Sequence, residues 1–224
     1  MDINRKRWND RHQKLNRTLA KGDRDTAIEL FLAQHAMVHS DKVARTGLWS
    51  FEDELLHGLN DARIRQIPPN GEHSIAWILL HLARIEDITM NMLVAGTEQI
   101  FIRNKWAKKL KVTVLHSANK MDAASIAKLS AEIDIKALRA YRIAVGKRTR
   151  QIALKLQAHD LKQKVDLARI KKVISTGAVT RDAMEIIHYW SKKTIAGLLL
   201  MPPTRHCILH LNEAMRIKKK LTRS

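Results

Sequence analysis

The stretch Thr204-Arg205-His206-Cys207-Ile208-Leu209-His210 follows Pro202-Pro203 and opens the last helix-patterned segment of the chain. On an α-helix, His206 and His210 lie one turn apart and project to the same side. Two imidazoles placed in this way can share one metal ion, but two ligands do not complete a site. A third candidate ligand is His81, in a distant apolar segment, so the fold must decide whether the three histidines can meet.

His81 belongs to the segment Ser74-Ile75-Ala76-Trp77-Ile78-Leu79-Leu80-His81-Leu82-Ala83-Arg84-Ile85-Glu86-Asp87. A helix is expected from about Ser74 to Ala95, with Ser74 near the N-cap and Gly96 as the C′ residue. Taking 100° per residue, a set of apolar side chains falls within about 60° of His81, namely Trp77, Ile78, Ile85, Ile88 and Met92. The pattern therefore predicts that His81 lies on a buried face.

The composition predicts an all-α protein with one domain. The chain has 224 residues, only 8 Gly and 4 Pro, and apolar residues at helical rather than alternating spacing. Its formal charge of +19 would attract nucleic acid, anionic membranes or acidic ligands. Because Lys and Arg are spread over the whole chain, a generally basic surface is favoured, and a specific polyanion site stays open as the alternative.

Few residues bear on the compartment. A single cysteine, Cys207, excludes an intramolecular disulfide. The longest apolar run, from Ile195 to Met201, is far too short to span a bilayer, and the first residues show no secretory signal. A cytoplasmic protein without a membrane partner is expected.

Four long helices are expected near residues 25–42, 74–95, 134–158 and 204–220. Residues 97–131 are taken as a long connection with two short helices, and further short helices are expected near 50–59, 165–174, 181–190 and 191–200. Pro202-Pro203 should end the helix before them, and Thr204 should cap the last one. Residues 1–23 are interpreted as a basic N-terminal extension, partly helical at most and outside the core, and residues 24–224 as the helical domain.

Several polar residues could support the three histidines. Glu213 falls about 20° from His206 around the helix, and could be a ligand, a partner of a ligand or a solvent-facing charge. His35 and His39 form a second i, i+4 pair on an apolar face and compete for the same metal; a role in lining the pocket or holding the ligands is favoured. Trp77 and Arg84, on the helix of His81, are further candidates for such a role.

Other chemistry has little support. A buried structural thiol is the favoured interpretation of Cys207. The chain has no Gly-rich phosphate loop, no Gly-x-Ser-x-Gly elbow and no His-Glu-x-x-His. Arg84, Glu86 and Asp87 could shape a polar site or form a structural group of ion pairs.

Together these segments resemble a known family. The Trp77-x-x-x-His81 pattern looks like the second-helix signature of the DinB/YfiT-like metalloenzymes, and His206-x-x-x-His210 resembles their fourth-helix pair. The resemblance implies a four-helix bundle with a long crossover between its second and third helices. It also implies that His81, His206 and His210 bind a divalent ion, with zinc or nickel expected. Leu211-Asn212-Glu213 departs from the Arg-Gly-Gln type continuation that is common in the family.

Three imidazoles leave coordination positions for water or substrate, which is typical of a catalytic site. The resembled family includes thiol-dependent S-transferases and isomerases, so a transferase or hydrolase acting with a small thiol or a small electrophile is the first hypothesis. A homodimer is the expected assembly. The alternative hypothesis is a non-enzymatic helical protein that binds nucleic acid, although no recognised DNA-binding motif supports it.

Overall fold

The computed structural model describes residues 2–69, 71 and 73–222, and this part of the chain is helical throughout, without a named strand. An isolated antiparallel bridge joins Lys164 and Thr194. The helices up to the middle of the chain are α1 (Ile3–Lys21), α2 (Arg24–Ala36), α3 (Phe51–Leu56), α4 (Asp61–Arg65), α5 (Ile75–Asp87), α6 (Ile100–Arg103) and α7 (Trp106–Leu110). They are followed by α8 (Ala123–Glu132), α9 (Ile135–Lys155), α10 (Ala158–Lys162), α11 (Leu167–Ser175), α12 (Met184–Ser191), α13 (Ile195–Leu200) and α14 (Cys207–Thr222).

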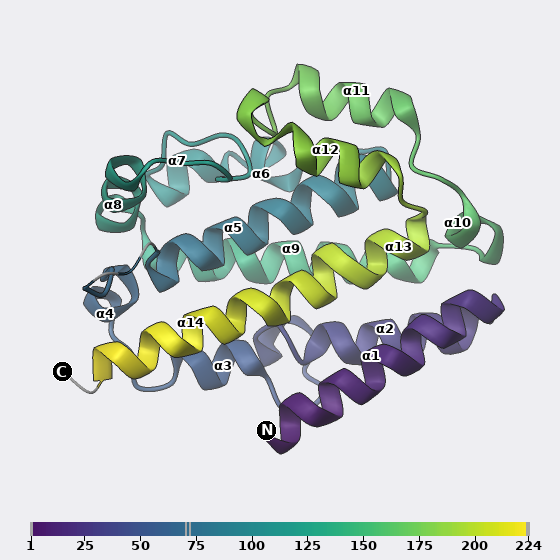
Figure 1. The fold of residues 1–224 in the computed structure, drawn as a ribbon, viewed down its shortest axis with the longest axis horizontal. Coiled ribbons are helices and arrows are strands. Elements are labelled where there is room, and N and C mark those ends of the chain that lie inside the picture. The colour runs from purple at the N-terminus through teal and green to yellow at the C-terminus, as the bar shows by residue number, and fades with distance from the viewer. Residues whose placement is uncertain (1, 70, 72, 223–224) are drawn as a thin grey trace.

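The long helices pack side by side around α5. Helix α5 contacts α9 and α14, α2 contacts α9, and α1 contacts α2. Figure 1 shows α5, α9 and the α13–α14 segment crossing the molecule, with α7 and α8 near one end, α10 near the other, and α11 and α12 along the upper side. The all-α prediction is confirmed, and none of the helices in the described residues is long and apolar enough to cross a membrane.

Helix α5 forms the centre of this packing. Every one of its residues is buried, and the hydroxyl of Ser74 accepts a hydrogen bond from the amide of Trp77 at 3.0 Å, which caps the first turn. The helix continues as a π-helical segment, Ile88–Val94, and Gly96 follows with φ +67°. The predicted helix and both of its end signals are confirmed. An apolar run with a capping residue at each end strongly favours a helix.

The helix that carries His206 begins earlier than predicted. Instead of ending at Pro202-Pro203, the chain passes from α13 through a π-helical turn, Met201–His206, directly into α14. Thr204 is therefore not an N-cap, and its hydroxyl donates to the carbonyl of Leu199 at 2.9 Å. The wider π-turn and this hydroxyl compensate for the missing proline N–H groups, so the break that proline usually imposes is avoided.

The N-terminal segment also differs from the prediction. Residues Ile3–Lys21 form one continuous helix, and Trp8, Leu15 and Leu19 are buried. Gln34 of α2 donates to the carbonyl of Trp8 at 2.8 Å, in a buried position. The expectation of a segment that is partly helical at most and outside the core was wrong, because its few apolar residues share one helical face that α2 covers. The division of the chain at residue 23 stays a prediction.

The other expected helices are present with shifted ends. The first long helix ends at Ala36, so His39 lies beyond it and not on its last turn. The third begins after its N-cap Asp134 and ends at Lys155. Three short helices, α6 to α8, occupy the connection between α5 and α9, where the sequence predicted two.

Candidate metal centre

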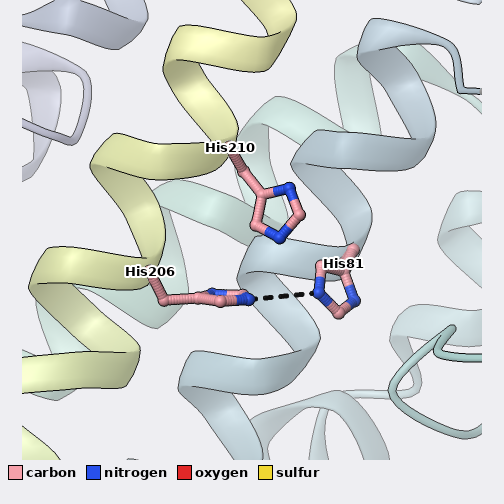
Figure 2. A group of neighbouring side chains, drawn as sticks. All are labelled: His81, His206 and His210. Atoms are coloured by element: carbon pink, nitrogen blue, oxygen red, sulfur yellow. Dashed lines mark hydrogen bonds between the residues drawn. The ribbon is translucent and has the colours of Figure 1, made fainter.

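Three histidine side chains meet where α5 lies against the start of α14. His81 comes from α5, His206 from the π-turn before α14, and His210 from the first turns of α14. Figure 2 shows the three rings turned toward one another across the gap between the two helices. Nε2 of His81 lies 3.3 Å from Nε2 of His206, and the ligand atoms of the three residues lie within 4.8 Å of one another.

Hydrogen bonds at Nδ1 fix two of the three rings. Nδ1 of His81 donates to the carbonyl oxygen of Ser117 at 2.8 Å, and Nδ1 of His210 donates to Oε2 of Glu213 at 2.8 Å. A carbonyl and a carboxylate only accept, so both rings carry their proton on Nδ1. Their Nε2 lone pairs are consequently free to face the centre of the group. This is the arrangement that metal-binding histidines use to fix ring tautomer and orientation.

A stack of rings supports His81 from one side. Trp77 lies parallel to His81, with ring centroids 5.0 Å apart, and His73 lies on the other face of Trp77 at 3.8 Å. Nδ1 of His73 donates to Oε1 of Glu213 at 2.9 Å. Glu213 thus accepts hydrogen bonds from His210 and His73 at the same time, and neither oxygen is directed at the centre of the group. Trp77 and Glu213 both contact a candidate ligand directly.

Burial keeps two of the candidate ligands, His81 and His206, uncharged. Burial, with help from the neighbouring His210, lowers the pKa of His81 to about 4. Burial and the same kind of neighbour lower the pKa of His206 well below its ordinary value. Hydrogen bonds from His210 and His73 hold the pKa of the Glu213 carboxyl well below its usual range. Near neutral pH the group therefore offers the neutral imidazoles of His81 and His206 close to the carboxylate of Glu213, and a divalent cation requires neutral imidazole ligands.

The spacing of the nitrogens fits a metal ion. Two ligands of a tetrahedral zinc, each about 2.0–2.1 Å from the ion, are about 3.3 Å apart, which is the separation of Nε2 of His81 from Nε2 of His206. Nδ1 of His206 is buried and has no hydrogen-bond partner in the described part of the chain. The only hydrogen-bond partner of this ring among the described residues is Nε2 of His81, whereas the other two rings also have a partner on Nδ1.

His35 and His39 do not join this site. They lie with Glu86 in a second group that is wholly buried. Nε2 of His35 and Nε2 of His39 each donate to one oxygen of Glu86, both at 2.9 Å. The Glu86 carboxylate therefore has a hydrogen bond to each oxygen, and the two imidazoles are used in holding it.

The second group fits a metal ion less well than the first. If Nε2 of His35 and His39 bound an ion, their protons would move to the Nδ1 atoms, which are buried without a partner among the described residues. A buried donor without an acceptor costs about 1–3 kcal/mol. With the protons on Nε2, both donors are satisfied by Glu86. The hydrogen bonds explain this group without an ion. In the first group His81 and His210 keep a polar partner on Nδ1 when Nε2 is given to a metal, and His206 alone would carry its proton on an unpartnered Nδ1.

Arg84 supports the site indirectly. Its guanidinium donates to the carbonyls of Leu115 and His116, at 2.7 and 3.2 Å, and lies over the ring of Phe101. It does not line the histidine group. By holding residues 115 and 116, it places the next carbonyl, that of Ser117, against His81.

Asp87 belongs to the same network, because it lies 3.8 Å from the guanidinium of Arg84 and both contact the hydroxyl of Tyr141. Its carboxylate accepts from the amides of Ile100 and Phe101 and from the hydroxyl of Tyr141, at 2.7 to 3.0 Å. Asp87 therefore ties the start of the α5–α9 connection to α9. The interpretation of Arg84 and Asp87 as structural partners is supported over that of a separate polar site.

Cys207 cannot act as a nucleophile in this state. It is fully buried, and burial raises the pKa of its thiol to about 12. Its Sγ lies 3.5 Å from the carbonyl oxygen of Pro202. The prediction of a buried structural thiol is confirmed.

An open cavity leads to the histidine group. It has a volume of about 230 Å³, and His206 forms part of its wall. Most of the remaining wall comes from α5, α12 and the π-turn before α14, through Ile85, Ile186, Trp190 and Met201. A small molecule in this cavity would lie against the ring of His206.

Some groups of the site could not be predicted from the sequence. The Ser117 carbonyl is a backbone group, which any residue would supply, and the α12 side chains come from a helix remote in sequence from α5. His73 did carry a signal, since His73, Trp77 and His81 are spaced four residues apart. Glu86 was recognised only as part of a charged trio, without its two histidine partners.

The helices and the site together define an all-helical protein with a three-histidine group that could hold a metal ion. The family model of the DinB superfamily matches residues 49–214, and the chain belongs to this superfamily. The matched region contains all three histidines but not α1, α2, His35 or His39. A comparison with curated proteins gave no match.

Proposed function

We propose that this protein is a divalent-metal-dependent enzyme of the transferase or hydrolase type, with zinc or nickel bound by His81, His206 and His210. The observation that carries the proposal is the convergence of the three rings while Ser117 and Glu213 occupy Nδ1 of two of them. In this proposal α2, α5, α9 and the α13–α14 segment are the four helices of a DinB-type bundle, and the α5–α9 connection is its crossover.

A divalent ion held by three imidazoles would keep positions for water or a thiol and would lower the pKa of the group bound there. The protein's own residues prepare that place. Ser117 and Glu213 fix two of the rings, and the stacked Trp77 restricts rotation of His81. The apolar walls beside His206 would exclude bulk water from a bound substrate.

The nucleophile in this proposal comes from outside the chain. The single cysteine is buried with its pKa raised, so no protein thiol is available to attack a substrate. Water or a small thiol would fill that role, and a small electrophile would be the second reactant. The thiol-dependent chemistry implied by the family resemblance is consistent with this division of roles.

The first test is the metal content of protein purified without a His tag. We expect about one divalent ion per chain, measured by mass spectrometry, and its loss in the double variant His206→Ala/His210→Ala. A matched control is His35→Gln/His39→Gln, which alters the other pair at the same spacing and keeps donors for Glu86. Full metal occupancy in the Ala double variant would refute the proposal. Loss of metal in the Gln double variant but not in the Ala double variant would show that the ion binds at Glu86 instead.

The second test is activity. The metal-loaded protein would be incubated with a panel of small electrophiles, with and without a small thiol, and consumption would be followed by mass spectrometry. Turnover that requires both the ion and His210 is the expected result. If all turnover persisted after chelation, a metal-dependent reaction would be refuted.

The alternative function rests on charge. Helix α1 exposes Lys6, Arg7 and Lys14 on its outer side, and a polyanion bound there would dissociate steeply as salt is raised. No detectable binding to duplex or single strands at low salt would remove this alternative. The homodimer and the cytoplasmic location expected from the sequence stay predictions; light scattering would test the former.

A further inference from the structure

The cavity beside His206 has walls that restrict what it can bind. Its apolar surface is formed by Ile85, Ile186, Trp190, Met201 and Pro202, together with the ring of Tyr189. The polar groups at its edge are few, and among them is the amide of Asn119, whose Oδ1 accepts from the hydroxyl of Ser117 at 2.6 Å. A ligand in this cavity would therefore exchange water mainly for hydrocarbon and aromatic contacts.

The charges around the cavity disfavour an anionic ligand. Although 41 of 224 residues are Lys or Arg, none of the described residues lining the cavity is Lys or Arg. The nearby Lys120 lies 3.4 Å from Oε1 of Glu185, and Lys193 lies over the ring of Tyr189 at 4.2 Å. An anion would lose its hydration against apolar walls and meet the carboxylate of Glu185, so an uncharged ligand is favoured.

The volume limits the size of the group that the cavity can enclose. An apolar cavity of about 150 Å³ is enough to admit benzene, and pockets for drug-sized molecules begin near about 300 Å³. The cavity at His206, about 230 Å³, lies between these limits. It would hold one aromatic ring with a short substituent, or a branched alkyl group of similar bulk.

We propose that the substrate at this site is a small, uncharged, largely apolar molecule, whose ring or branched alkyl group fills this cavity and whose reacting group faces His206. The role of the molecule as substrate rests on the proposed function. Its binding in the cavity rests on the walls alone and needs no ion. The two proposals can therefore fail separately.

The test uses the full-length protein after removal of metal by a chelator, with toluene and benzoate as a neutral and an anionic probe of the same ring. Saturation-transfer NMR titrations should show toluene binding more tightly than benzoate. Ile186→Trp should weaken toluene binding by at least about ten-fold, because the indole would occupy the space that the ring needs. The matched control is Ile174→Trp on α11, where the native side chain is 40% exposed and does not line the cavity.

A second variant covers the case in which Ile186→Trp does not fold. Ile186→Ala enlarges the cavity and should shift the preference from toluene toward 1-methylnaphthalene. The proposal would be overturned by benzoate binding as tightly as toluene. Equal toluene affinity in all three variants would overturn it as well. Toluene binding as expected in a protein that never holds metal would refute the proposed function and leave the apolar cavity intact.

Discussion

Glu213 gives the sharpest test of the metal centre, because it touches a proposed ligand without being one. Its carboxylate accepts from Nδ1 of His210 at 2.8 Å, and loss of such a partner typically weakens metal binding about 10- to 100-fold. Since the side chain of Glu213 is 27% exposed, water can replace part of the lost bond. We therefore expect Glu213→Ala to raise the dissociation constant for zinc about 10- to 30-fold, or about 1.4–2 kcal/mol.

The assay is competition for zinc against a chromophoric chelator at pH 7.5. Glu213→Gln keeps a carbonyl oxygen for Nδ1 of His210, so its loss should be smaller than that of the Ala variant. Glu132→Ala, which removes an exposed acid on α8, is the control for a change in net charge. His73→Ala removes the other partner of Glu213 and the ring stacked on Trp77, but leaves the bonds at Nδ1 of His81 and His210, and should stay within about three-fold of the wild type.

Two results would refute this reasoning. Zinc affinity of Glu213→Ala within about two-fold of the wild type would show that the bond to His210 does not support the ion. An equal loss in His73→Ala would show that the bond from His210 to Glu213 supports the ion no more than the contacts of His73 do. Either result would separate the hydrogen bond seen in the structure from any role in metal binding.

Three further predictions concern stability, each measured by urea unfolding of the metal-free protein. A Cβ on Gly146 would lie 2.9 Å from Nδ1 of the buried His39, so Gly146→Ala should destabilise the fold by about 1–3 kcal/mol. The control is Gly197→Ala, whose added Cβ would have no neighbouring atom closer than 3.4 Å and should stabilise the fold by up to about 1 kcal/mol. Arg142→Met leaves the buried carboxylate of Glu52 without its ion pair and should lower the free energy of unfolding by about 3–5 kcal/mol. Adding Glu52→Gln to this variant removes the unpaired charge and should restore part of the lost stability. Burial lowers the pKa of His39 from 6.5 to about 3. Between pH 6.5 and about 3 the ring is therefore neutral in the folded protein and takes up a proton on unfolding. The free energy of unfolding should fall as the pH is lowered through this range, by at most about 1.4 kcal/mol per pH unit from this ring. A shallower fall in His39→Gln is expected, and an unchanged slope would contradict this assignment.

Helices were predictable where an apolar stripe and its end signals agreed, as for α5 with Ser74 and Gly96. The errors arose where a local rule met a tertiary contact. The rule that proline ends a helix did not anticipate the π-turn in which Thr204 donates to Leu199. The three apolar residues of α1 were too few to predict burial, because the surface of α2 that covers them is not visible in the α1 sequence.

The sequence by itself determined the helical class, the positions of the main helices and the pairing of His206 with His210, because helix geometry alone places residues four apart on one side. It also placed His81 on a buried face. It left the role of Glu213 open, although Glu213 lies one turn from His210 on the same helix. Only the tertiary structure decided that Ser117 holds His81, that His35 and His39 belong to Glu86, and that α12 forms a wall of the cavity. The contacts of His81 with Ser117 and of His35 with Glu86 join groups 36 and 51 residues apart, and packing, rather than any local spacing, determines that they meet.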